Sequence, residues 1–244
     1  MNVAGKQRLD LVLVARGLAE SRKKAQALIM AGSVMVKGQK ASKPGQTVEP
    51  EAEITVAAPP RYVSRGGLKL EAALREFAVD PTGIVCLDVG ASTGGFTDCL
   101  LQHGALRVHA IDVGTNQLDY RLRTDPRVRS QEHRNARELV AGDIGELVEL
   151  LVCDVSFISV TLLLPAIVPL LTPAGKMIIL VKPQFEVGKG QVGKGGIVRD
   201  AALHLSACAR VEEAVRDAGY ETALMPSPIE GTEGNKEFLL YGHH

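Results

Sequence analysis

The sequence predicts an α/β fold built on a mainly parallel β-sheet, preceded by a small α+β domain. From residue 64 to residue 244, apolar runs of strand length alternate with helical patterns, which is typical of a parallel sheet covered by helices on both faces. Residues 1–58 instead hold two helical patterns followed by short β segments. Pro59 and Pro60 stiffen the chain between the two, so residues 59–63 are expected to form a linker.

Start and stop signals place two helices in the first domain. Arg8-Leu9-Asp10 begins the first helix, which has apolar residues on one face and ends at Gly17. Ser21 caps a second helix, which stops at Gly32. Short β segments are expected after it, at residues 34–36, 47–48 and 54–56.

Six apolar runs in the second domain have the length of buried strands. They lie at residues 84–89, 108–113, 150–155, 176–182, 221–225 and 237–241. Helical patterns lie between them, the clearest at residues 68–77 and 201–218.

The composition is that of a soluble globular protein, and we expect it in the cytoplasm. Hydrophobic residues make up 45% of the 244 residues and charged residues 23%. The sequence has no apolar stretch long enough for a membrane helix and no apolar signal-peptide core. Four cysteines without a C-x-x-C pair are interpreted as small buried side chains, so neither a metal site nor a disulfide is expected.

The net charge of zero hides an asymmetry. Residues 1–70 hold 12 Lys and Arg against five Asp and Glu, whereas the remainder holds 16 against 23. A small basic module on an acidic body favours a polyanionic partner for the N-terminal part, although a charged run is also common on any solvated face.

A glycine-rich turn follows the strand expected at residues 84–89. It reads Asp88-Val89-Gly90-Ala91-Ser92-Thr93-Gly94-Gly95-Phe96. Glycines there let the backbone approach a ligand closely, at the sheet edge where α/β folds bind cofactors. Asp112 ends the next strand and could accept both hydroxyls of a ribose. The dinucleotide spacing G-x-G-x-x-G is missing, and the acid two positions before Gly90 fits a sulfonium amino acid better than a pyrophosphate, so S-adenosylmethionine is favoured over a nicotinamide cofactor.

A second glycine-rich stretch satisfies most of a phosphate-loop pattern. It runs Gly188-Lys189-Gly190-Gln191-Val192-Gly193-Lys194. Gly195 follows where the pattern needs a Ser or Thr for Mg²⁺, so we interpret the stretch as a mobile basic loop beside the active site rather than a nucleoside-triphosphate site.

The first domain follows a known pattern of residues. The series is Arg8-Leu9-Asp10, Gly17-Leu18, Ser21-Arg22, Ala25, Leu28-Ile29, Gly32, Val34, Val36 and Lys43-Pro44-Gly45. It resembles the S4-type RNA-binding domain of a ribosomal protein, pseudouridine synthases and tyrosyl-tRNA synthetases. The resemblance implies helices that present Arg and Lys to RNA phosphates. The candidate RNA-binding residues are Arg8, Arg22, Lys23, Lys40 and, in the second domain, Arg65.

Four charged residues of the second domain lie where chemistry is expected, at strand ends or at a helix start. They are Lys69 after Ser64-Arg65-Gly66-Gly67, Asp154 in Cys153–Phe157, Lys182 in Val181–Glu186, and Glu237 in Gly234–Phe238. Two lysines oriented by two carboxylates suit the methylation of a ribose hydroxyl, a poor nucleophile that needs a base and in-line placement. A lysine is a base only in its neutral form, which burial or a neighbouring cation favours.

Three long runs carry a second resemblance. They are Ser64-Arg65-Gly66-Gly67-x-Lys69-Leu70, Asp88-x-Gly90-Ala91-Ser92-Thr93-Gly94-Gly95-Phe96-Thr97 and Val181-Lys182-Pro183-Gln184-Phe185-Glu186. From Arg8 to Leu240 the chain resembles the TlyA family, which pairs an S4-type domain with an FtsJ-like methyltransferase domain. The resemblance implies a Rossmann-like class I methyltransferase sheet of seven mostly parallel strands. It also implies 2′-O-methylation of cytidine in ribosomal RNA (16S, 23S or both), with S-adenosylmethionine as cofactor and ribosomal RNA or subunits as partners.

The resemblance further implies a role for each site residue. Lys182 is the base, and Lys69 favours its neutral form and contacts the substrate. Asp154 and Glu237 orient the two amines, with Asp154 also close to the methyl donor. The residues expected to hold the cofactor are Asp88, Gly90, Ala91, Ser92, Gly94, Phe96, Asp112, Asn135 and Asp154.

Each candidate also has a structural alternative. Lys69 could be an exposed lysine at a helix start, Glu237 a solubilising charge on an edge strand, and Asp154 with Lys182 a structural ion pair. Asn135 lies in a segment of little periodicity. For the whole chain, the alternatives are a non-catalytic rRNA-binding assembly factor and, from the family's other name, a pore-forming hemolysin, for which no membrane-spanning or strongly amphipathic segment is evident in the sequence.

Overall fold

The computed structural model describes residues 5–58, 60–231 and 234–244. The chain divides into two compact units, Met1–Pro60 and Arg61–His244, which we call the N-terminal and C-terminal units. The predicted linker begins at Pro59, which lies outside the described residues. Tyr62, also within that predicted linker, is buried in the core of the C-terminal unit beside Leu70.

The N-terminal unit is a small α+β domain around one apolar core. Its elements are β1 (Gln7–Arg8), α1 (Leu9–Ala15), α2 (Arg22–Met30), β2 (Val34–Val36), β3 (Gln39–Lys40), β4 (Thr47–Val48) and β5 (Ile54–Val56). Both predicted helices and all three predicted β segments are confirmed, and the Ser21 side chain accepts the Lys24 backbone N–H at 3.2 Å as the predicted cap. Strands β1 and β3 were not predicted, because two residues are too short to show alternation.

The described part of the C-terminal unit contains one seven-stranded sheet. Its strands are β6 (Val85–Val89), β7 (Arg107–Ile111), β8 (Val128–Gln131), β9 (Val148–Cys153), β10 (Leu171–Val181), β11 (Glu221–Pro226) and β12 (Phe238–His243), in the order β11-β12-β10-β9-β6-β7-β8. Only β12 runs antiparallel to its neighbours β10 and β11, and the other described pairs are parallel. The predicted mostly parallel sheet of seven strands is therefore confirmed.

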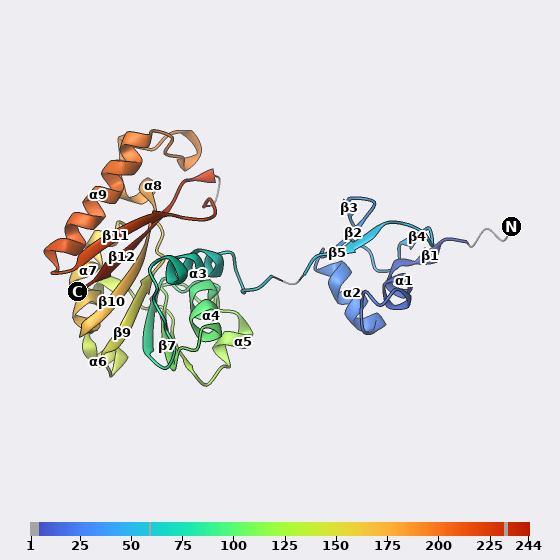
Figure 1. Cartoon of the computed structure of the whole chain (residues 1–244), viewed down its shortest axis with the longest axis horizontal. Helices are drawn as coiled ribbons and strands as arrows, with labels where there is room; N and C mark the ends of the chain where they lie inside the picture. The colour runs from blue at the N-terminus through green and yellow to red at the C-terminus, as the bar shows by residue number, and fades with distance from the viewer. Residues whose placement is uncertain (1–4, 59, 232–233) are drawn as a thin grey trace. The chain divides into compact units, whose positions relative to one another are not determined.

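Helices cover both faces of this sheet (Figure 1). They are α3 (Gly66–Glu76), α4 (Gly95–Gln102), α5 (Tyr120–Arg123), α6 (Ala141–Ile144), α7 (Leu164–Ile167), α8 (Pro183–Glu186) and α9 (Ala201–Asp217). On one face α3, α4 and α5 pack against the sheet, and on the other α6, α7 and α9 enclose a second apolar cluster. All four cysteines are buried and unpaired, as their apolar surroundings predicted.

The strand order reverses between β6 and β9, and this reversal positions the site. From β6 the chain proceeds through β7 and β8 in one direction, and from β9 through β10 in the other. Ligands of open α/β sheets bind beyond the carboxyl ends of the strands at such a switch point. The predicted strands at residues 150–155 and 176–182 hold Asp154 and Lys182 near their ends; the observed strands stop one residue before each of them, β9 at Cys153 and β10 at Val181, so both residues lie just beyond the sheet edge.

Candidate active site

The glycine-rich turn joins β6 to α4 through left-handed backbone. Gly90 and Gly94 have φ of +85° and +96°, which glycine adopts without strain. A Cβ added to Gly90 would lie 2.4 Å from the backbone oxygen of Asp154, so a larger residue would push the neighbouring strand end away. The turn and the end of β9 are therefore in direct contact.

Asp112, beyond β7, lines a cavity of about 460 Å³ beside this turn. The Ser92 and Gly114 backbone N–H groups donate to its two carboxylate oxygens, each at 2.7 Å, and fix the carboxylate in one orientation. The cavity is lined by polar and apolar groups from several segments: Val89, Gly90, Ser92, Ile111, Asp112, Val113, Gln117, Arg134, Asn135, Ala136, Asp154, Val155, Ser156, Phe157, Ile158 and Leu163. An anchored acid, Asp112, and a largely apolar wall suit a ribose with an attached planar base.

Asn135 belongs to this cavity, although its surroundings gave little signal in the sequence. Its Oδ1 accepts the Arg137 backbone N–H at 3.1 Å and caps a short 3₁₀ turn, Ala136–Glu138. Its Nδ2 donates to Glu138 Oε1 at 3.1 Å. The amide is thus held rigidly at the cavity wall.

A second, more polar cavity of about 260 Å³ adjoins the first. It is lined by Ser64, Arg65, Gly66, Lys69, Gly90, Ala91, Ser92, Thr93, Gly95, Phe96, Asp154, Ser156 and Lys182. Four of these residues also line the larger cavity: Gly90, Ser92, Asp154 and Ser156. We call the first, which holds Asp112, the Asp112-side cavity and the second the lysine-side cavity. A ligand in one would reach the other past Asp154.

The four predicted catalytic side chains form two ion pairs. Lys182 Nζ lies 2.5 Å from Asp154 Oδ1, and it donates to Ser156 Oγ at 2.9 Å. Lys69 pairs with Glu237, and both side chains are almost entirely buried.

Lys69, Asp154 and Lys182 line the lysine-side cavity. Glu237 contacts Lys69 from outside this cavity and, with Phe238, lines a separate pocket. The structure brings the four side chains to one end of the sheet. Their roles stay predictions.

Asp88 and Gly94 support the turn from below. Asp88 is completely buried, and Thr97 Oγ1 donates to its Oδ2 at 2.6 Å. Burial away from water raises the pKa of this carboxyl to about 7. Gly94 packs against Leu118 and Leu122, where a Cβ would collide with both side chains. In contrast, Ala91 and Phe96 line the lysine-side cavity.

Phe157 is a site residue that the sequence did not single out. Its side chain is 92% exposed, its φ is +68°, and it borders the Asp112-side cavity. Its ring lies 5.3 Å from that of Phe185. A left-handed backbone is unfavourable for an aromatic residue, and such strain concentrates at functional sites. The spacing of apolar residues predicts strands and helices, but it cannot identify a single exposed residue of this kind.

The stretch proposed as a basic loop forms two 3₁₀ turns, Lys189–Gln191 and Lys194–Gly196. Its far end is fixed by the buried Asn235, which accepts the Val198 backbone N–H and donates to the Gly196 carbonyl, each at 3.1 Å. Asn235 lies two positions before Glu237, so this stretch is anchored to the loop that carries that acid.

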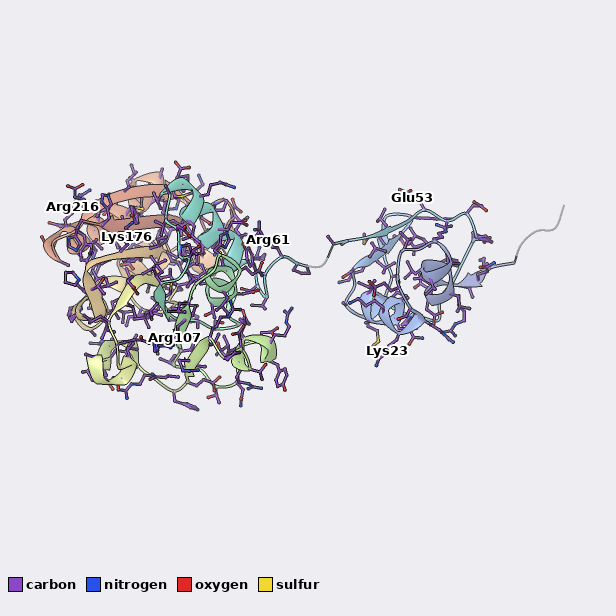
Figure 2. The ribbon with its side chains drawn as sticks, turned by 60° about the horizontal axis from the view of Figure 1, so that its bottom comes forward. Lys23, Glu53, Arg61, Arg107, Lys176 and Arg216 are labelled. Carbon is purple, nitrogen blue, oxygen red and sulfur yellow. The ribbon has the colours of Figure 1, made fainter. Side chains whose placement is uncertain are left out.

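Four of the five RNA-binding candidates lie in the N-terminal unit, and Arg65 lies in the C-terminal unit at the lysine-side cavity. Arg8 and Arg22 are half-exposed, and both donate to the fully buried Asp10. Lys23 and Lys40 are exposed, and Figure 2 shows the Lys23 side chain extending from the surface of this unit.

Among the described residues, His, Cys, Asp and Glu side chains form no group of three or more that could hold a metal ion. No helix in the described part of the chain is both long and apolar enough to cross a bilayer.

Comparison with known families and curated proteins covers almost the whole chain. The FtsJ-like methyltransferase model matches residues 62–244, and the S4 domain model matches residues 7–54. The 16S/23S rRNA (cytidine-2′-O)-methyltransferase TlyA of Mycobacterium tuberculosis is 46% identical over 98% of this chain and 90% of its own length. Hemolysin A of Brachyspira hyodysenteriae is 44% identical over 96% of this chain and 98% of its own length.

Solved structures agree with these matches. A protein from Streptococcus thermophilus, provisionally named a hemolysin, is 44% identical with a TM-score of 0.75, over 98% of this chain and 88% of that one. A Burkholderia thailandensis N-methyltransferase solved with S-adenosylhomocysteine shares the fold at 19% identity and a TM-score of 0.50, over 72% of this chain and 77% of that one.

Proposed function

Because the chain belongs to the FtsJ-like methyltransferase family and carries an S4 domain, we propose that it methylates the ribose 2′-hydroxyl of a cytidine in ribosomal RNA. The proposed methyl donor is S-adenosylmethionine, and the target lies in 16S RNA, 23S RNA or both. The observation that carries the proposal is the pair of lysine–carboxylate contacts at the end of the sheet, Lys182–Asp154 and Lys69–Glu237. The M. tuberculosis relative, named for this reaction on 16S and 23S RNA, supports the choice of substrate.

The residues of the two cavities fit S-adenosylmethionine. Asp112, fixed by two backbone N–H groups, has free lone pairs for the ribose hydroxyls, and Asn135 with Val113 and Ala136 offers an amide and an apolar wall for the base. The amino-acid end would lie along Gly90 and Ser92, toward Asp154. When bound there, the cofactor supplies an electrophilic methyl group on its sulfonium.

The side chains of the lysine-side cavity then act on the RNA hydroxyl. Lys182 accepts the proton of the 2′-hydroxyl, and Asp154 holds the amine in place. Lys182 can accept that proton only as the neutral amine, and the side chains of Arg65 and Lys69 line the same cavity. Glu237 neutralises Lys69 from behind, which leaves Lys69 available to position the substrate oxygen.

Phe157 is suited to receive the target base. Ribosomal RNA is largely paired and stacked, so a nucleotide must leave its stack to reach an enclosed cavity. An almost fully exposed ring beside the site offers a new stacking surface, which is worth about 1–3 kcal/mol per base in comparable proteins. The exposed lysines and half-exposed arginines of the N-terminal unit would bind phosphates.

The decisive experiment compares Lys182→Ala with Lys176→Ala. Lys182 directly follows β10, whereas Lys176, labelled in Figure 2, is exposed on β10 and lines neither cavity. With radiolabelled S-adenosylmethionine and ribosomal subunits, we expect Lys182→Ala to slow single-turnover methylation at least about 100-fold, the usual contribution of a general base. Cofactor and RNA binding should persist, and Lys176→Ala should behave as the wild type.

Mass spectrometry of the RNA ribose groups identifies the product of the same reactions. Undiminished transfer by Lys182→Ala would refute the role of Lys182. A wild-type protein that binds subunits but leaves no label in either RNA would indicate a non-catalytic assembly factor instead.

A further inference from the structure

We propose that Ser156 is a positioning residue of this reaction, which orients the Lys182 amine together with Asp154. The inference rests on the proposed function and adds to it a residue outside the two lysine–carboxylate pairs. Its basis is the position of Ser156 Oγ, 2.9 Å from Lys182 Nζ, in a side chain that lines both cavities.

The geometry of an amine explains why a second acceptor matters. A neutral lysine nitrogen carries its carbon, two hydrogens and one lone pair in a tetrahedral arrangement. One acceptor fixes one hydrogen, but the lone pair can still occupy either of the two remaining tetrahedral positions. Here the hydrogen bond to Ser156 at 2.9 Å fixes one N–H, and the Asp154 carboxylate, an ion-pair contact at 2.5 Å, attracts the other N–H to its own side, so that the two contacts together select one direction for the lone pair. The remaining direction is the one open to a hydroxyl in the lysine-side cavity.

The segment that carries Ser156 is held in place by the helix that follows Lys182. Helix α8 begins directly after Lys182, and its last residue, Glu186, is buried. Glu186 accepts the Ser159 hydroxyl at 2.5 Å and the Val160 backbone N–H at 2.9 Å. One buried carboxylate thus fixes the segment that follows Ser156.

The contact between the Phe157 and Phe185 rings joins the same two segments again. The segments that carry Lys182 and Ser156 are consequently joined by two separate contacts, and a proton-transfer site requires its groups to be held in fixed positions.

The experiment measures single-turnover methylation of ribosomal subunits at saturating S-adenosylmethionine, together with the dissociation constants for cofactor and RNA. We expect Ser156→Ala to lower the rate about tenfold, the effect of losing one hydrogen bond to a charged or reacting group. Both dissociation constants should stay within about twofold of the wild type, as for an interaction made in the reacting complex alone.

Two further variants separate positioning from folding. Ser156→Thr keeps the hydroxyl, and the exposure of Ser156 leaves room for the added methyl, so it should recover most of the rate. Ser130→Ala, an identical deletion at an exposed position on β8, should have no effect.

Three outcomes overturn the inference. A Ser156→Ala rate equal to wild type removes the positioning role while leaving the proposed function intact. A dissociation constant for S-adenosylmethionine raised tenfold with an unchanged saturated rate makes Ser156 a cofactor contact instead. A wild-type protein that labels no RNA overturns the proposed function, and this inference falls with it.

Discussion

Each unit of the molecule contains a completely buried aspartate, and the two have opposite pKa shifts. In the N-terminal unit, Asp10 accepts hydrogen bonds from Arg8, Arg22 and Gln26 at 2.8 to 3.0 Å, and the Arg8 guanidinium holds its pKa well below the usual range. In the C-terminal unit, burial raises the pKa of Asp88 to about 7, and among the described residues its Oδ1 has no hydrogen-bond partner.

The comparison teaches that the donors around a buried carboxyl, rather than burial itself, decide its charge. Two guanidiniums keep Asp10 ionised, and the carboxylate in return holds those guanidiniums at the surface of the unit, half in solvent. A single hydroxyl from Thr97 is too little to keep Asp88 charged. The N-terminal unit therefore uses a buried charge to present cations, whereas the C-terminal unit holds beneath its glycine turn an acid that binds its proton more tightly than an exposed aspartate.

The largest effect should follow from Asp10→Ala. Removing the carboxylate leaves Arg8 and Arg22 without their common partner, and we expect a loss of about 2–3 kcal/mol in the stability of the N-terminal unit, since both arginines are partly solvated. Hydrogen exchange followed by mass spectrometry should show faster exchange across residues 9–56 only.

Asp125→Ala is the control, because it breaks a surface pair with Arg127 and should cost less than about 1 kcal/mol. Equal losses of stability for Asp10→Ala and Asp125→Ala would show that the buried Asp10 carboxylate contributes no more than the surface pair of Asp125 and Arg127.

A smaller effect should appear in the pH dependence of the protein's stability, through the titration of Asp88. Its pKa in the folded chain, about 7, lies above the ordinary value of 3.8, so the folded state holds the proton more tightly. Stability from this group is present below about pH 4 and is lost as the pH rises to about 7, at no more than about 1.4 kcal/mol per pH unit.

Denaturant unfolding of wild type and Asp88→Asn at pH 5 and pH 7 tests this directly. The asparagine variant does not titrate and should gain about 1–2 kcal/mol relative to wild type over that interval. A constant difference between the two proteins would show that Asp88 is ionised throughout.

The smallest effect is expected at a single exposed lysine. Lys23→Ala removes an exposed cation, so the fold should be unchanged and RNA binding only slightly weaker. The slope of log affinity against log salt should fall by about 0.7 to 0.9, the value for one phosphate contact. Filter binding over a salt series measures it, with Lys176→Ala as the control. An unchanged slope would place Lys23 outside the RNA interface.

The sequence predicted the type and order of most elements, because apolar periodicity survives wherever a strand or helix is buried. It failed where that signal is weak. Strand β8 was not predicted, since Val128 is its only fully buried residue at the sheet edge. The two-residue strands β1 and β3 carry no period at all.

Site residues were predicted by motif and resemblance, and their contacts were beyond the sequence. The pairing of Lys69 with Glu237 joins positions 168 residues apart, a contact that no local pattern encodes. Ser156 and Phe157 stood in a quoted motif but went unassigned, because a hydrogen bond to Lys182 and a left-handed φ arise only when the strand ends meet.

The same long-range pair has a consequence for biosynthesis. Lys69 is on the first helix of its unit and Glu237 immediately precedes the last strand, so a nascent chain holds the lysine long before it holds the acid. Until translation reaches that acid, the lysine must remain in solvent, because a buried cation without a counter-charge is strongly disfavoured. The Lys69–Glu237 pair, and with it the folded arrangement of this end of the sheet, therefore forms only when synthesis of the C-terminal unit is nearly finished.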